Sequence, residues 1–206
     1  MSLSLIKGTP AEPLVNPNGH AVSKLTVGVG WDKSSGGKKG FAGMLSRAKG
    51  IDLDLAGLVY DNTGSGVRVC GFDTPDLFGG GMHHTGDNKT GKGDGIDESM
   101  EIDLDRLPPN ITGIVVTLNA FKKGVSFANI AGADCFFSEN FGKDLFGLGQ
   151  FAVPIDDATK NTIFMARILR DATSGGWTIK VVNAMGSAIN GDPRQLLSVG
   201  KAYLTV

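Results

Sequence analysis

Residues Leu25-Thr-Val-Gly-Val-Gly-Trp31 carry an apolar side chain at every second position. This alternation is typical of a β-strand with one buried face and one solvated face. The same pattern recurs at residues 51–55 and 100–104. Further β-rich runs, separated by Gly, Pro, Asn and Asp, are residues 67–72, 114–121, 125–130, 163–170, 177–184 and 202–206. We therefore expect strands to dominate the structure.

The spacing of these runs predicts an all-β protein, a two-sheet β-sandwich with long acidic loops at one end. Only one short helix is expected, over residues 193–199, with Asp192 as its N-cap and Pro193 at its first position. The absence of alternating strand and helix patterns argues against a doubly wound parallel sheet. At 206 residues, we expect a single domain over residues 1–206.

Composition narrows the class of protein. Apolar residues make up 41% of the chain and charged residues 20%, which is enough apolar material for a sizeable core. The net charge of -1 and pI near 6.3 exclude the basic footprint of a dedicated nucleic-acid binder. No run reaches the roughly 18 apolar residues of a membrane span, and no signal peptide is visible at the N-terminus. We expect a cytoplasmic protein in which Cys70 and Cys135 stay reduced.

Acidic residues are concentrated between positions 87 and 105, which hold seven of the 21 carboxylates. They are Asp87, Asp94, Asp97, Glu98, Glu101, Asp103 and Asp105; one glycine directly precedes them and three are interspersed among the first of them. Two carboxylates about 4 Å apart repel by about 4 kcal/mol at an effective dielectric constant near 20, and a hard divalent cation removes that cost. Calcium suits a flexible loop best, because it accepts about six to eight oxygens in loose geometry.

Two other segments offer carboxylates at strand ends. In Ile51-Asp-Leu-Asp-Leu55 the apolar residues take one face, so Asp52 and Asp54 share the other. Asp32 follows directly on the strand that ends at Trp31. Three separate segments therefore supply candidate ligands.

Simpler interpretations exist for part of this cluster. Glu101, Asp103 and Asp105 alternate with apolar residues, which favours the solvent face of a strand. For Asp87, Asp94, Asp97 and Glu98, spacing alone leaves open whether they bind a cation or form an acidic turn kept for solubility. The loop is not an EF-hand, since its third, fifth and sixth positions are Lys89, Gly91 and Lys92.

Two other motifs suggest a phosphate site and a zinc site, but their residues argue against both. One long basic segment has two possible interpretations. Residues 86–93 nearly match a phosphate-binding P-loop, but Gly93 replaces the hydroxyl that would bind magnesium and the flanking aspartates would repel phosphate. His83 and His84 are adjacent and would point to opposite sides of an extended segment, which argues against zinc; His84 is expected to position the loop. The basic, Gly-rich segment 33–50 is either a solvated insertion or a contact for an anion or partner.

The stretch His84-Thr-Gly-Asp87-Asn88-Lys-Thr-Gly-Lys-Gly-Asp94-Gly-Ile-Asp97-Glu98 resembles the signature of the TerD tellurite-resistance and stress-response family, H-x-G-D-N-x-T-G-x-G-D-G-D-D-E. Its companions occur in order along the chain: Leu3-Ser-Leu-Ile-Lys7-Gly8, Gly28-x-Gly30-Trp31-Asp32, Asp52-Leu-Asp54, Phe127-Ala-Asn-Ile130, and Trp177 with Gly186. The similarity thus spans most of the chain.

The resemblance implies a β-sandwich that binds Ca²⁺. It also implies a cytoplasmic protein that joins other stress-response proteins in membrane-associated complexes, which confer resistance to tellurite, phage or xenobiotics. Carried over by position, the calcium ligands would be Asp32, Asp52, Asp54, Asp87, Asn88, Asp94, Asp97 and Glu98, with the carbonyls of Gly91 and Gly93. The chain departs from the signature at Ile96, which replaces an Asp and removes one carboxylate. The segment between Asp32 and Asp52 is also longer than usual in the family, and the C-terminal glycine pattern is only partly kept.

We therefore expect a calcium-binding scaffold or sensor and no enzymatic activity. The alternative is a metal-dependent phosphoester hydrolase, because carboxylates around a cation can activate water. No Ser-His-Asp order, no G-x-S-x-G motif and no histidine base beside the acids stands out in the sequence. Nucleic acid is not expected as a direct partner, and the sequence leaves the oligomeric state open.

Overall fold

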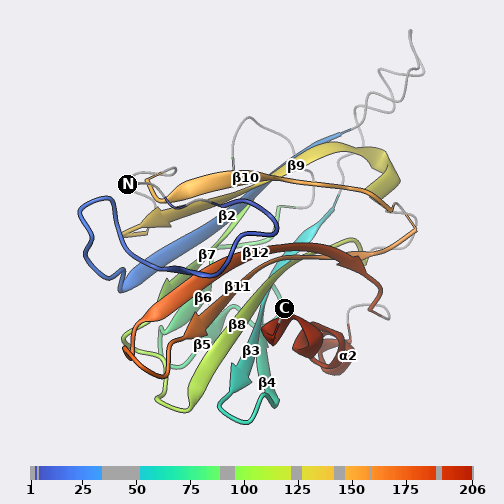
Figure 1. Cartoon of the computed structure of the whole chain (residues 1–206). Coiled ribbons are helices and arrows are strands. Elements are labelled where there is room, and N and C mark those ends of the chain that lie inside the picture. The colour runs from blue at the N-terminus through green and yellow to red at the C-terminus, as the bar shows by residue number, and fades with distance from the viewer. Residues whose placement is uncertain are drawn as a thin grey trace, which may run out of the picture.

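The computed structural model describes residues 3, 5–33, 52–88, 96–121, 127–141, 147–157, 159–188 and 192–205. Within them the chain forms two six-stranded antiparallel sheets packed face to face, with a short helix beside one of them (Figure 1). The predicted two-sheet β-sandwich is confirmed.

The first sheet has the strand order β1-β12-β11-β8-β3-β4. Its strands are β1 (Glu12–Pro13), β12 (Trp177–Gly186), β11 (Thr162–Arg170), β8 (Ile111–Asn119), β3 (Asp54–Asp61) and β4 (Gly66–Cys70). The second sheet has the order β10-β9-β2-β7-β6-β5. Its strands are β10 (Gly149–Val153), β9 (Ile130–Glu139), β2 (Lys24–Lys33), β7 (Glu98–Asp103), β6 (Met82–His84) and β5 (Asp76–Leu77).

The main core lies between the two sheets. Leu25, Val27 and Val29 of β2 are fully buried there, as the alternation in the sequence predicts. Fully burying one such side chain stabilises the fold by about 1.5–3 kcal/mol. The sheets approach closely at Gly57 of β3, where a Cβ atom would lie 2.8 Å from the sulfur of Met100 in β7.

A second, smaller core lies on the outer face of the first sheet. There the helix α2 (Pro193–Gly200) and the 3-10 helix η2 (Lys201–Leu204) cover Leu58, Tyr60 and Phe164. The Tyr60 hydroxyl donates a hydrogen bond to the Leu197 carbonyl over 2.9 Å. Because β3 is covered on both faces, all its residues between the terminal aspartates are buried.

The start of α2 is the one predicted from the sequence. The Asp192 side chain accepts a hydrogen bond from the Arg194 amide, and Pro193 occupies the first turn. An oxygen acceptor at the N-cap satisfies one of the amides that a helix leaves unpaired at its beginning. The expected N-cap is thus confirmed.

Several expected elements differ in the structure. Residues 202–204 belong to η2 and not to a strand, because Tyr203 stacks on Phe164 at 4.3 Å and continues the apolar face of α2. Within the expected run 125–130, Phe127–Asn129 form the 3-10 helix η1, and residues 125 and 126 lie outside the described part. β5 and most of β6 lie within residues 73–83, where no strand is expected from the sequence. Asp103, expected on the solvent face, is buried, and Arg106 lies 3.5 Å from its carboxylate.

Strand register brings the predicted acidic segments to one end of the sandwich. Val29 of β2 pairs with Glu98 at the start of β7, and Asp54 at the start of β3 pairs with Asn119 at the end of β8. Antiparallel pairing thus gathers the ends of strands that are far apart in sequence.

Among the described helices, none is long and apolar enough to cross a bilayer.

Candidate metal centre

Three carboxylates converge at this end of the molecule. Oxygens of Asp52, Asp54 and Asp87 all lie within 4.8 Å of one another. Asp54 is the first residue of β3, Asp52 precedes it by two residues, and Asp87 comes from the segment after β6. Asp52 and Asp54 are half-buried, whereas Asp87 is exposed. The alternation of residues 51–55 correctly places the first two on one side of the chain.

The electrostatics of this cluster are unfavourable without a cation. Burial, followed by the negative charges of Glu98, Asp52, Asp87 and Asp73, raises the pKa of Asp54 to about 7. Each of these causes disfavours the ionised carboxylate. A divalent cation would neutralise the cluster, and oxygen-only ligands in flexible geometry fit calcium better than magnesium or zinc. The donor chemistry therefore fits the ion implied by the sequence.

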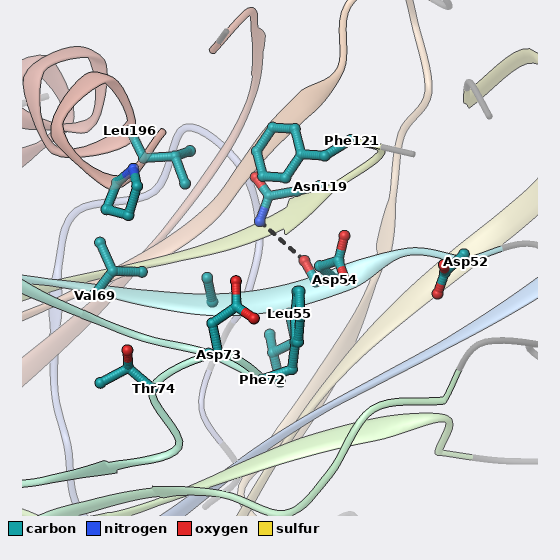
Figure 2. Close-up of a pocket in the computed structure, with 13 residues that line it drawn as sticks. Asp52, Asp54, Leu55, Val69, Phe72, Asp73, Thr74, Asn119, Phe121 and Leu196 are labelled. Carbon is teal, nitrogen blue, oxygen red and sulfur yellow. Dashed lines mark hydrogen bonds between the residues drawn. The ribbon is translucent and has the colours of Figure 1, made fainter. Parts of the chain in front are cut away.

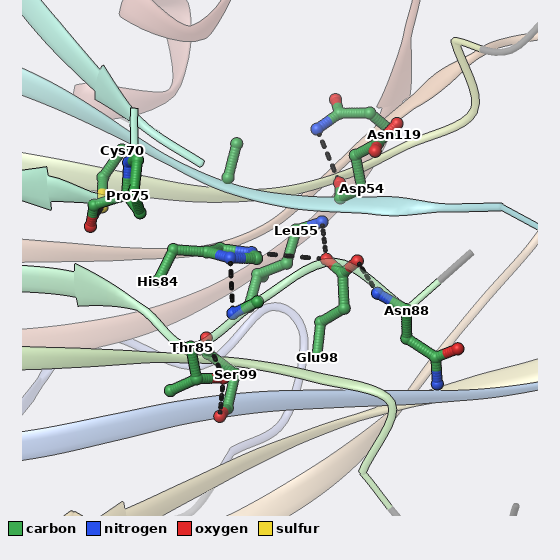
Figure 3. A network of polar contacts seen from close by, with 12 residues as sticks. Asp54, Leu55, Cys70, Pro75, His84, Thr85, Asn88, Glu98, Ser99 and Asn119 are labelled. Atoms are coloured by element: carbon green, nitrogen blue, oxygen red, sulfur yellow. Dashed lines mark hydrogen bonds and ion pairs between the residues drawn. The ribbon is translucent and has the colours of Figure 1, made fainter. Parts of the chain in front are cut away.

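Glu98 ties the two sheets together beside the cluster (Figure 3). Its buried carboxylate accepts a hydrogen bond from the Leu55 amide at 2.8 Å and another from the Asn88 amide at 3.0 Å. Leu55 lies on β3 and Glu98 on β7, so this side chain links strands of opposite sheets. It also fixes the backbone next to Asp87.

His84 supports Glu98 from the other side. The ring Nε2 lies 3.3 Å from a Glu98 carboxylate oxygen, and both side chains are fully buried. The Gly86 amide donates a hydrogen bond to Nδ1 at 3.3 Å. His84 therefore contacts the start of the loop that carries Asp87. This is the loop that His84 is expected, from the sequence, to position.

Asp97 has both oxygens engaged by donors of the protein. The Trp31 amide donates to one oxygen at 2.9 Å, and the Asn88 side-chain amide donates to the other at 2.8 Å. The Asp97 amide donates in turn to the Val29 carbonyl at 2.8 Å. Asp97 thus attaches the acidic loop to the end of β2.

The predicted ligands divide into three groups. Asp52, Asp54 and Asp87 form the cluster, while Asn88, Asp97 and Glu98 form the hydrogen-bonded frame beside it. Asp32 lies near the end of β2, where its backbone pairs with Gly132, but its side chain lies outside the described residues. Gly91, Gly93 and Asp94 also lie outside the described residues. Their role as ligands stays a prediction.

The sequence did not point to two residues at this site. The Asn119 side-chain amide donates to the Asp54 carbonyl at 2.9 Å, and Asp73 adds its negative charge. Both line a cavity of about 330 Å³ between β3 and α2 (Figure 2). Finding Asn119 requires the pairing of β3 with β8, which no spacing in the sequence reveals.

Comparison with known proteins gives a consistent result. The family model described as TerD domain matches residues 1–198 of the chain. The chain is 35% identical over 144 residues to the tellurium resistance protein TerZ of Serratia marcescens, covering 69% of this chain and 72% of that protein. It is 37% identical over 124 residues to the stress response protein SCP2 of Bacillus subtilis, covering 59% of this chain and 61% of that protein.

The fold is also found among solved structures. The crystal structure of a homologue of the telluride resistance protein TerD from Streptomyces coelicolor superposes with a TM-score of 0.63 at 21% identity. The superposition covers 85% of this chain and 95% of that one. At this level of identity the likeness concerns the fold alone.

Proposed function

Because the chain belongs to the TerD domain family, we propose that it is a calcium-binding stress-response module of the tellurite-resistance type. It binds Ca²⁺ through its clustered acidic segments and acts as a scaffold or sensor within a cytoplasmic complex. Its partners are other stress-response proteins, assembled at a membrane surface. The names of its relatives, which refer to tellurium resistance and to stress response, support this biological setting.

The observation that carries the calcium proposal is the convergence of Asp52, Asp54 and Asp87 within 4.8 Å. Such convergence is costly for a protein at neutral pH unless a cation shares the site. The hydrogen-bonded frame of Asn88, Asp97 and Glu98, with His84 packed against Glu98, supports the segments that carry the cluster. A preorganised, oxygen-rich site with some flexibility is what Ca²⁺ requires.

A binding role agrees with the chemistry around the cluster better than a catalytic one. His84, which contacts Glu98 beside the cluster, has a fully buried side chain that lies against Glu98 and Gly86, away from solvent. A bound calcium ion in this account orders the acidic loops and completes a surface for a protein partner. The role is structural or sensory, and the affinity for calcium decides between these two.

Calorimetric titration with CaCl₂ of protein previously treated with a chelator tests the proposal. We expect saturable heat from the wild type and at least about tenfold weaker binding for Asp54→Asn and Asp52→Asn, a loss of about 1.4 kcal/mol or more. Asp105→Asn is the matched control, because Asp105 is exposed beyond the far end of β7 and should bind as the wild type does.

Two results would contradict the proposal. The first is the absence of calcium binding in the wild type, and the second is equal binding by Asp54→Asn. Hydrolysis of a phosphoester substrate with calcium, magnesium or manganese, abolished by the same substitution, would instead establish a metal-dependent hydrolase.

A further inference from the structure

A cavity on the outer face of the first sheet is lined by both apolar residues and carboxylates. It lies between β3, the turn after β4, the end of β8 and the start of α2, and its volume is about 330 Å³ (Figure 2). Val69, Phe72, Phe121 and Leu196 supply apolar surface to its lining. Asp52, Asp54 and Asp73 supply carboxylates.

An unsatisfied hydrogen-bond acceptor lies in the wall of this cavity. Asn119 is fully buried. Its side-chain nitrogen donates hydrogen bonds to the Asp54 carbonyl at 2.9 Å and to the Thr117 hydroxyl at 3.1 Å. Its side-chain oxygen is buried and accepts no hydrogen bond from any described residue. Figure 2 shows this oxygen on the side of the amide that faces Phe121 and Leu196, away from Asp54. A buried acceptor without a donor destabilises the folded state, and an N–H group of a ligand would satisfy it.

We propose that this cavity binds a small organic cation, an ammonium or guanidinium group carried on an apolar body. The polar side chains that the described wall offers to a ligand are three carboxylates, the Asn119 oxygen and the Thr74 hydroxyl, all of which accept hydrogen bonds. Positive charge with N–H donors is complementary to that set. Phe72 and Phe121 supply apolar contact and aromatic faces, which also attract cations.

The dimensions of the cavity favour a small molecule over a protein surface. Ligand pockets for small molecules have volumes of about 300–1,000 Å³ and combine apolar walls with a few convergent polar groups. Here the walls come from several elements and enclose a space at the lower end of that range.

The proposed ligand goes beyond calcium binding and can be tested separately from it. Asp52 and Asp54 belong to both sites, but Phe72 and Asp73 line the cavity and are not members of the carboxylate cluster. Phe72 is 43% exposed and Asp73 is exposed, so substitutions there should leave the fold intact. Titrations in a chelator remove calcium from the comparison.

The experiment is a calorimetric titration of the full chain in EGTA with 4-phenylbutylamine, whose ammonium group and phenyl ring match the carboxylates and the apolar residues of the lining. We expect saturable binding, with about tenfold weaker binding of the neutral 4-phenylbutanol and none of the anionic 4-phenylbutyrate. Asp73→Asn should weaken amine binding about threefold through the lost charge, and Phe72→Ala about fivefold through the lost apolar contact. Asp105→Asn, which removes a carboxylate elsewhere, should bind as the wild type does.

The proposal is overturned if the amine does not bind at millimolar concentration, or if the alcohol binds as tightly as the amine. It is also overturned if neither Asp73→Asn nor Phe72→Ala weakens binding. Since no calcium is present, these results decide the proposal whether or not the protein binds calcium in the separate titration.

Discussion

Glu98 is the side chain on which the geometry of the acidic end depends most. Its buried carboxylate accepts hydrogen bonds from the Leu55 and Asn88 amides and contacts His84. Buried N–H groups that lose their acceptor cost about 1–3 kcal/mol each. The cost of removing Glu98 should therefore exceed the gain from reduced repulsion at Asp54, which is only partly shielded from solvent.

We expect Glu98→Ala to lower the free energy of unfolding by about 3 kcal/mol, measured by urea denaturation in a chelator. Glu101→Ala is the matched control, because Glu101 lies three residues along the same strand and is only half-buried. That variant should stay within about 0.5 kcal/mol of the wild type. Equal stability of the two variants would show that Glu98 does not hold the frame.

The raised pKa of Asp54 should make the stability of the calcium-free protein depend on pH. Its pKa is about 7 in the folded state, against 3.8 for an unperturbed aspartate, so the folded state holds this proton more tightly than the unfolded state does. The favourable contribution of the protonated group is complete below pH 4 and is lost as the pH rises to about 7. With allowance for solvent screening of a partly exposed group, the loss is on the order of 2 kcal/mol.

The measurement compares wild type with Asp54→Asn by urea denaturation in EGTA at pH 4.5 and 7.5. The variant, which cannot ionise, should gain stability relative to the wild type at the higher pH. A difference between the two proteins that stays constant with pH would contradict this account of the cluster.

At the scale of elements, the close packing of α2 on β3 determines the effect of a glycine substitution. Gly200 ends α2 with a helical φ of -63°, so alanine there would ordinarily stabilise the helix by about 1 kcal/mol. An added Cβ atom, however, would lie 2.5 Å from the Leu58 side chain and in contact with the Tyr60 hydroxyl. The second core has no room for this atom.

We therefore expect Gly200→Ala to destabilise the protein by about 1–3 kcal/mol, with a lower midpoint of thermal unfolding. Ser198→Ala is the control in the same helix, because Ser198 is exposed, and it should be neutral or slightly stabilising. Stabilisation by Gly200→Ala would mean that α2 is not packed against β3 as described.

The elements also show what could be predicted from sequence. Alternation identified β2 and the residues that β7 buries, since each buries one face against the opposite sheet. It failed at residues 202–204, where an apolar run packs as part of a helical cap. It also failed at β5 and β6, which have two and three residues and are too short to show a period.

The candidate site was predictable to the extent that it is local in sequence. Asp52 and Asp54 followed from alternation along one strand, and Asp87 from the density of acids and glycines around it. Asn119 and Asp73 could not be predicted, because they reach the site only through the pairing of β3 with β8 and the turn after β4. The pairing register of strands that are far apart in the sequence cannot be inferred from local sequence patterns.

At the scale of the whole molecule, calcium should act on global stability, because the proposed ligands come from segments attached to strands of both sheets. A ligand at about 100 times its Kd stabilises the folded state by about 2.7 kcal/mol. For a chain of this size, that corresponds to an increase of about 5–10 °C in Tm. We expect this rise in scanning calorimetry of the wild type, and less than half of it for Asp52→Asn at the same calcium concentration.

The most direct test of the central claim, that the acidic segments meet around one cation at the end of β2, is terbium luminescence excited through tryptophan. Trp31 donates its amide to Asp97 beside the cluster, whereas Trp177 begins β12 and stacks with Arg170. The account predicts sensitised emission that calcium displaces, that Trp31→Phe abolishes and that Trp177→Phe preserves. Emission that is absent from the wild type, or that survives Trp31→Phe and disappears with Trp177→Phe, would contradict it.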